Sequence, residues 1–176
     1  RLVDALQKQQ VRLIGFDVVF SEAELNPVSQ VLASGQLSEA TATELQPLVA
    51  QLDGDSQFAK VISKNTVLGY FLHNSGGIHV GELPAPILRI DSKDKNKLSM
   101  NFMPDYTGNL PMFAKTVVGA GFVTTLPDVD GVMRRSPLVL RYEDGLYSSL
   151  SLELAKIYLN APFVKLQTVK SGSYCV

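Results

Sequence analysis

The sequence predicts an α/β fold: a central mixed, partly parallel sheet with helices on both faces, in a single domain with a helical insertion. Residues 11–20 and 66–73 are apolar almost throughout and rich in β-branched and aromatic side chains, which is typical of strands covered on both faces. A helical pattern precedes each segment. The order helix, strand, helix, strand favours a parallel pair with a right-handed crossover.

The composition is that of one folded domain. The chain has 176 residues, of which 45% are apolar and 19% charged, so it can form a core and is not a disordered chain. The formal net charge of −1 provides no basic excess, and we expect no nucleic-acid partner. With Cys175 as its one cysteine and with two histidines, the chain is expected to hold no disulfide, no metal and no cofactor.

The N-terminal part is expected to alternate between core and surface elements. Residues 1–10 have the pattern of a helix end that leads into the strand at 11–20. Residues 21–53 are polar, contain two prolines and show helical spacing of leucines. We expect one or two surface helices there, with residues 23–53 forming the helical insertion.

A better-defined helix follows the insertion. Asp55 or Ser56 would cap it, since a side-chain oxygen can accept a hydrogen bond from an unpaired backbone N–H group. The helix would end near Asn65 and present an apolar stripe to the core, formed by Phe58, Val61 and Ile62.

The middle of the chain is expected to be irregular. Short strands are predicted at residues 87–90 and 98–102, and the charged run at 91–97 indicates a solvated loop. A short helix would begin at Leu110-Pro111, because proline fits the first turn of a helix.

A glycine-containing strand is predicted at residues 119–125, where the glycines would let a neighbouring element pack closely. After a turn at 126–131, a long strand would cover residues 132–142. The dipeptide Asp144-Gly145 then indicates a hairpin.

The C-terminal part is expected to contain a helix capped by Ser148 or Ser149 and a final strand at residues 163–169. The core stripe of this helix would consist of Leu150, Leu154, Ile157 and Tyr158. One domain would therefore span residues 1–170, and residues 171–176 would form a tail.

Arg134 and Arg135 are the first candidates for a ligand site. In the predicted strand, Arg134 would point to the same face as most of the apolar residues. A bulge at Pro137 would instead turn Arg135 toward that face. The inward arginine needs a carboxylate partner, for which Asp17 and Asp130 are candidates. A structural ion pair is the simpler interpretation. The alternative is a guanidinium group that holds a ligand carboxylate or phosphate in a bidentate fork.

Asp17 is the second candidate, because it interrupts an apolar strand. In open α/β sheets, ligands lie beyond the carboxyl ends of the strands, so Asp17 would form a pocket wall together with Ser21 and Glu22. A turn cap or an ion pair with Arg134 is the simpler interpretation.

Motifs for other activities are incomplete. The chain has no G-x-S-x-G elbow, and His73 and His79 have no evident catalytic partners. The glycines at 119–121 precede strand-like residues rather than a helix, which argues against a nucleotide loop. The acidic turn at 128–131 lacks the further ligands of a calcium loop.

Several segments together match the pattern of a known family. They are IGFDVVFSE (14–22), DSQFAKVI leading to VLGY (55–70), NLP (109–111) and, most specific, GAGFVTTLPDVDGVMRRSPLVLRYEDGLYSSLSLELA (119–155). Over about residues 5–160 the chain resembles the cyclase- and histidine-kinase-associated extracellular sensory domain of the second type, one of the CHASE families.

The resemblance implies a non-catalytic, extracytoplasmic (periplasmic) input domain of a bacterial inner-membrane receptor, tethered through flanking transmembrane helices. It implies an unknown small-molecule ligand, an association into homodimers and a cytoplasmic output, either a kinase or an adenylate or diguanylate cyclase. The family usually begins with a strand and a helix, and this chain is expected to start within that helix. No stretch of the chain itself approaches the roughly 20 apolar residues that cross a bilayer.

Two other functions stay open from the residues alone. A small α/β hydrolase-like enzyme would need a serine paired with a base in a cleft. A structural protein-interaction domain would instead present a large exposed apolar patch without a pocket.

Overall fold

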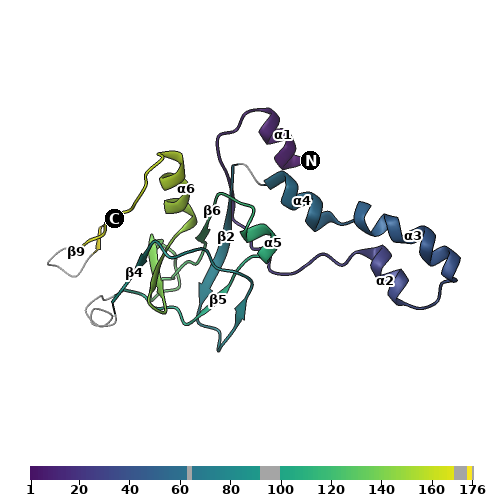
Figure 1. The fold of residues 1–176 in the computed structure, drawn as a ribbon. Coiled ribbons are helices and arrows are strands. Elements are labelled where there is room, and N and C mark those ends of the chain that lie inside the picture. The colour runs from purple at the N-terminus through teal and green to yellow at the C-terminus, as the bar shows by residue number, and fades with distance from the viewer. Residues whose placement is uncertain (63–64, 92–99, 169–173, 176) are drawn as a thin grey trace.

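The computed structural model describes residues 1–62, 65–91, 100–168 and 174–175 (Figure 1). It confirms the predicted fold class: a mixed, partly parallel sheet lies at the centre, and helices cover both of its faces. The division into one domain (1–170) and a tail (171–176) stays a prediction. Residues 169–173 and 176 lie outside the described part of the chain.

The central strand is β2 (Thr66–His73), as predicted. β1 (Ile14–Phe16) and β6 (Gly119–Phe122) run parallel to β2 along its two opposite edges. The end of β2 pairs antiparallel with β5 (Asp105–Thr107), to which β3 (His79–Val80) adds in parallel. The sequence did not indicate β3 and β5, which are two and three residues long.

A smaller antiparallel sheet has the order β4 (Leu88–Arg89), β8 (Gly145–Ser148) and β7 (Val139–Tyr142). β7 and β8 form the predicted hairpin, in which Tyr142 pairs with Gly145. The strand predicted at 87–90 is therefore present but shorter. Of the strand predicted at 98–102, the described part forms only one bridge, between Phe102 and Arg141. Most of the loop predicted at 91–97 lies outside the described residues.

The final strand predicted at 163–169 is present only at β9 (Gln167–Thr168), which pairs with β10 (Tyr174–Cys175). Phe163 is 75% exposed and belongs to no strand, whereas Leu166 is partly buried against the cluster of Ile90, Val139 and Leu146.

Three helices cover one face of the central sheet: α1 (Leu2–Lys8), α4 (Gly54–Ile62) and α5 (Pro111–Ala114). Four rings pack between these helices and the end of β1, with centroids 5.1–5.9 Å apart and ring planes inclined by 56–89°: Phe16, Phe20, Phe58 and Phe113. The predicted cap of α4 was wrong by a few residues, because Asp53 accepts the hydrogen bond from the Ser56 backbone N–H.

Glycines let α6 (Leu150–Tyr158) pack closely on the other face. A Cβ atom at Gly121 would lie 2.5 Å from Leu150 Cα, and one at Gly119 would lie 2.8 Å from Ile157 Cδ1. The expectation that these glycines permit close packing is confirmed. Ser149 caps the helix, as predicted, by accepting a hydrogen bond from Leu152 N.

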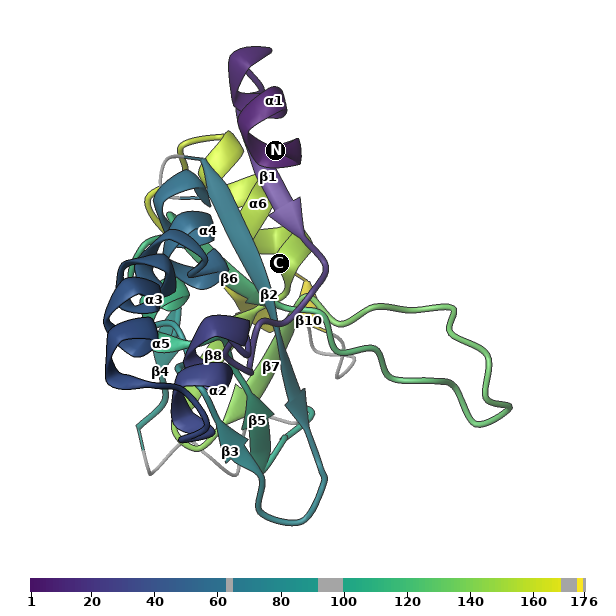
Figure 2. The same ribbon diagram turned by 90° about the vertical axis from the view of Figure 1, so that its right-hand side faces the viewer.

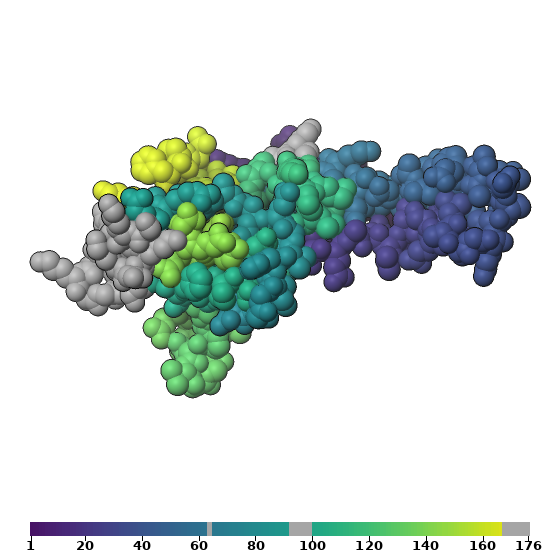
Figure 3. Space-filling view, turned by 60° about the horizontal axis from the view of Figure 1, so that its bottom comes forward, coloured from purple at the N-terminus to yellow at the C-terminus, as the bar shows by residue number. Residues whose placement is uncertain are grey.

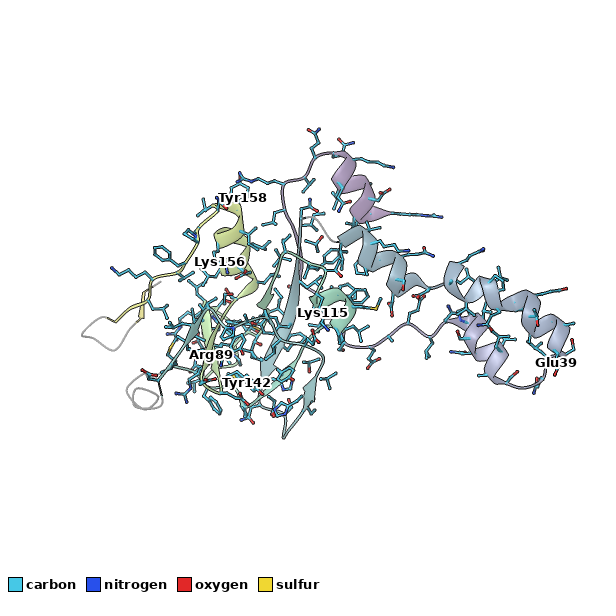
Figure 4. All side chains as sticks on the ribbon, viewed as in Figure 1. Glu39, Arg89, Lys115, Tyr142, Lys156 and Tyr158 are labelled. Atoms are coloured by element: carbon cyan, nitrogen blue, oxygen red, sulfur yellow. The ribbon has the colours of Figure 1, made fainter. Side chains whose placement is uncertain are left out.

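The predicted core stripe of α6 was wrong at its end. Tyr158 is 51% exposed at the outer end of the helix, where Arg12 stacks over its ring at 4.3 Å (Figure 4). Glu153 is buried instead, because Ser148 Oγ donates to its carboxylate at 2.8 Å and Lys156 Nζ lies 2.7 Å away.

The predicted insertion is helical. α2 (Pro27–Ala33) and α3 (Glu39–Gln51) pack against each other and project from the body of the domain, with Glu39 at the far end (Figures 1 and 4). Neither helix contains a buried residue. The insertion is therefore a surface appendage.

The long strand predicted at 132–142 was wrong, since only Val139–Tyr142 is a strand. Residues 123–138, here called the arm, leave the end of β6, turn at Asp130-Gly131 and return to β7. The arm projects away from the domain (Figures 2 and 3). Prolines in both limbs, Pro127 and Pro137, lack the N–H group that a strand ladder needs.

Candidate functional site

The carboxyl ends of β1 and β6 lie at the same edge of the sheet, on either side of β2. They meet over Gly69, where a Cβ atom would lie 2.9 Å from Phe16 O, 3.3 Å from Val18 O and 3.0 Å from Val123 Cγ1. The segment after β1, which contains Asp17, and the base of the arm therefore start from neighbouring positions. Ligands bind open α/β sheets at such an edge.

The segment after β1 is fixed by a buried amide. Asn109 accepts a hydrogen bond from Phe20 N and donates one to Gly69 O, both at 2.8 Å. Because this side chain holds the backbone away from β2, the strand predicted at 11–20 ends at Phe16. Asp17 is exposed. One sign of this role is visible in the sequence, where Asn109–Pro111 is part of the family pattern.

The tip of the arm is a tight turn. Asp128 N donates to Val132 O at 3.0 Å, and Gly131 N donates to Asp128 O at 2.8 Å. Gly131 has a φ of +79°, which side-chain-bearing residues rarely adopt. The Asp130 carboxylate accepts a further hydrogen bond from Val132 N at 3.1 Å.

Two arginines tie the limbs of the arm together. Arg135 Nη2 lies 2.6 Å from Asp128 Oδ1, and Arg134 Nη2 lies 2.8 Å from Asp130 Oδ2. Arg134 Nη1 also lies 3.5 Å from Asp128 Oδ2. The hydrogen bond from Arg134, followed by that from Val132 N, holds the pKa of Asp130 below its ordinary value.

The structure brings three of the four predicted site residues together. Asp130 is the partner of Arg134, as one of the two alternatives predicted, and Asp128 is a second partner that the sequence indicated only as a turn residue. Asp17 does not pair with either arginine in the described structure. The expectation of an inward arginine was wrong: the two side chains are 56% and 85% exposed, because the arm leaves the sheet.

Two shallow hollows flank the arm. One, of about 420 Å³, lies at the tip among Asp128, Val129, Asp130, Arg134 and Arg135. The other, of about 380 Å³, lies between the middle of the arm (126–128 and 135–137) and Asn101. Both open to solvent. Since each guanidinium group already faces a carboxylate, an anionic ligand would have to displace Asp128 or Asp130 to bind.

A family comparison decides what kind of domain carries this arm. The family model described as CHASE2 domain matches residues 1–174. This chain belongs to the CHASE2 family. No curated protein and no solved structure matches it. CHASE2 domains are extracellular sensory domains associated with cyclases and histidine kinases; they are typically non-catalytic and generally extracytoplasmic.

Two histidines of this CHASE2 domain lie near the end of the sheet, His73 at the end of β2 and His79 at the start of β3. His73 Nε2 and Thr107 Oγ1 are 2.9 Å apart, but within the described residues no partner orients His73 Nδ1. His79 stacks on Tyr106, with centroids 5.2 Å apart. The Thr107 hydroxyl is thus paired with a base, His73. The third group that orients the base in a catalytic triad is absent from the described residues.

A buried carboxylate organises the turn before β3. Asp105 accepts hydrogen bonds from Ser75 N at 2.7 Å and Gly77 N at 3.0 Å. The bond from Ser75, with those from Gly77 and Gly76 and the charge of His79, holds the pKa of Asp105 below its ordinary value. His79 Nε2 lies 3.6 Å from this carboxylate. These contacts indicate a structural role for both residues.

The rest of the described CHASE2 domain adds two facts. None of its helices is long and apolar enough to span a bilayer. Within the same residues, no three His, Cys, Asp or Glu side chains are grouped as metal ligands would be.

Proposed function

We propose that this CHASE2 domain is the extracytoplasmic input domain of a bacterial transmembrane receptor that acts as a homodimer. It senses an unknown small ligand or stimulus and controls a cytoplasmic kinase or nucleotide cyclase in the same polypeptide. The observation that carries the proposal is the family match, which covers residues 1–174.

The geometry of the arm supports a mechanism for such sensing. The arm is continuous with β6 at one end and with β7 at the other, and α6 packs on the glycines of β6. An anionic ligand that competes for Arg134 or Arg135 would open the pairs with Asp128 and Asp130. Two arm conformations with different ligand affinity are what a signal requires.

The proposed ligand-facing residues are accordingly Asp130, Arg134 and Arg135 on the arm, with Asp17 beyond the end of β1. Inorganic phosphate and succinate are suitable probes, because both offer oxygens that fit a guanidinium fork. A binder should raise the melting temperature of the isolated domain by mass action. The double variant Arg134→Gln/Arg135→Gln should lose that rise, whereas Glu39→Gln on the insertion should keep it.

The location is tested in cells that express the longer protein. A cysteine at the exposed position Ser29, in a Cys175→Ser background, should react with a membrane-impermeant maleimide in intact cells. Labelling only after lysis would place the domain in the cytoplasm and overturn the proposal.

A protein-interaction role is the second candidate. It is favoured by one observation, the apolar side chains at the tip of the arm. Val129 is fully exposed, and Met133 is 62% exposed.

A further inference from the structure

The tip of the arm exposes apolar side chains where nothing in the described domain covers them. Val129, Val132 and Met133 lie within five positions of one another, and 48% or more of each side chain is exposed. Scattered exposed apolar residues are ordinary, but a group on a projecting element marks an interaction site.

The backbone of the arm is also largely unpaired. Between the base and the tip, the limbs share one backbone hydrogen bond, from Asp128 N to Val132 O, among the described residues. Extended segments with free N–H and C=O groups readily accept another chain.

The charges of the arm are arranged for self-complementarity. One limb ends in Asp128 and Asp130, and the other begins with Arg134 and Arg135, so the tip has no net charge. A two-fold axis near the tip would place the acidic limb of one arm against the basic limb of another. Such an interface uses the same patch on both subunits.

We infer that the arm is the pairing element through which two copies of this domain associate about a two-fold axis at its tip. Val129 and Met133 of one copy pack against those of the other. Some of the ion pairs between aspartate and arginine within each arm are replaced by ion pairs between the aspartates of one arm and the arginines of the other. The inference rests on the proposed function in one respect, namely that the receptor acts as a homodimer.

The size of the arm sets the expected strength of pairing. Standard interfaces use roughly 20–30 residues on each side. The arm covers residues 123–138 and is smaller, so the isolated domain should associate weakly, with a dissociation constant of about 1 μM or higher. Tethering two copies side by side raises the effective concentration to about the millimolar range, which suffices for such a contact.

Sedimentation velocity on the isolated domain, at about 1 μM to 1 mM, tests the inference. The wild type should show a reversible monomer–dimer equilibrium. Val129→Asp and Met133→Asp should each weaken it at least about tenfold, because each introduces like charges at the axis. Leu48→Asp is the matched control: Leu48 is also exposed, but on α3, and its variant should associate like the wild type.

Charge exchange provides a second test that a folding defect cannot imitate. Arg134→Asp/Arg135→Asp and Asp128→Arg/Asp130→Arg should each self-associate weakly, whereas an equimolar mixture should recover dimers. A monomeric wild type across the whole range, or an equal loss in Leu48→Asp, would overturn the inference. Labelling at Ser29 is independent of pairing, so a failure here is distinguishable from a failure of the receptor proposal.

Discussion

Arg135 and Asp128 join the two limbs of the arm, with Nη2 and Oδ1 2.6 Å apart across seven positions of sequence. Around this contact, Arg134 and Asp130 form a second pair at 2.8 Å. The tip is thereby shaped before any partner or ligand arrives. A ligand or a second arm that uses these guanidinium groups must exchange its own carboxylate for Asp128 or Asp130.

The ion pairs of the arm should contribute little to the stability of the monomer. Arg134→Gln/Arg135→Gln is expected to leave the urea midpoint of unfolding nearly unchanged, because exposed ion pairs are screened by solvent. Urea denaturation at low protein concentration measures this. A clear shift of the midpoint to lower urea would mean that the ion pairs of the arm help to hold the fold together.

The contact between β6 and α6 should be intolerant of side chains. Gly121→Ala is expected to destabilise the domain by about 1–3 kcal/mol or more, because its Cβ would meet the backbone of Leu150 and Ser149. Gly119→Ala should cost less, since the nearest atom is the flexible end of Ile157. Thermal unfolding of both variants gives the order; the reverse order would contradict the described packing.

Asn109 should be required to hold the segment after β1 in place at the carboxyl ends of the parallel strands. Asn109→Leu would leave Phe20 N and Gly69 O unpaired, and a loss of about 2–4 kcal/mol is expected, at 1–3 kcal/mol for each buried group. Asn26→Leu removes an amide that also bonds backbone groups, but on the insertion, and should cost less. Equal losses would show that burial of Asn109 has no special effect.

Asp105 should make stability depend on acidic pH. Its pKa is lower in the folded than in the unfolded chain, so the folded state binds fewer protons and its stability falls as pH drops below about 4. Well above that pH, where the carboxyl is ionised in both states, the contribution is fully present. Asp105→Asn should flatten the slope of unfolding free energy against pH below about pH 4. An unchanged slope would show that other carboxyl groups dominate acid unfolding.

The sequence predicted correctly the elements that residues close together in the chain determine. The continuous apolar run of β2, the Ser149 cap and the hairpin at Gly145 all depend on neighbouring residues, and all three are confirmed. The pairing of Arg134 with Asp130, four positions apart, is local in the same sense.

The predictions that were wrong concern elements that depend on residues distant in the sequence. β1 ends early because Asn109, from a distant segment, holds Phe20. β3 and β5 form only because they meet each other and the end of β2. Residues 132–138 alternate like a strand because extended backbone has the same period whether or not a neighbour pairs with it. Both arginines are therefore exposed. The alternation of residues along the chain could not show whether either side chain points toward the core.

We expect the arm to pass a signal from paired input domains to the output. The output activity of the longer protein in membranes, with Val129→Cys in a Cys175→Ser background, measures this. Oxidation should cross-link the two arm tips and change the rate of phosphotransfer or cyclic-nucleotide synthesis from that of the wild type. Reduction should restore the wild-type rate. The control Ser29→Cys should leave the rate unchanged under both conditions. An equal rate in the oxidised, cross-linked protein and in the reduced Val129→Cys protein would contradict a role of the arm in signalling.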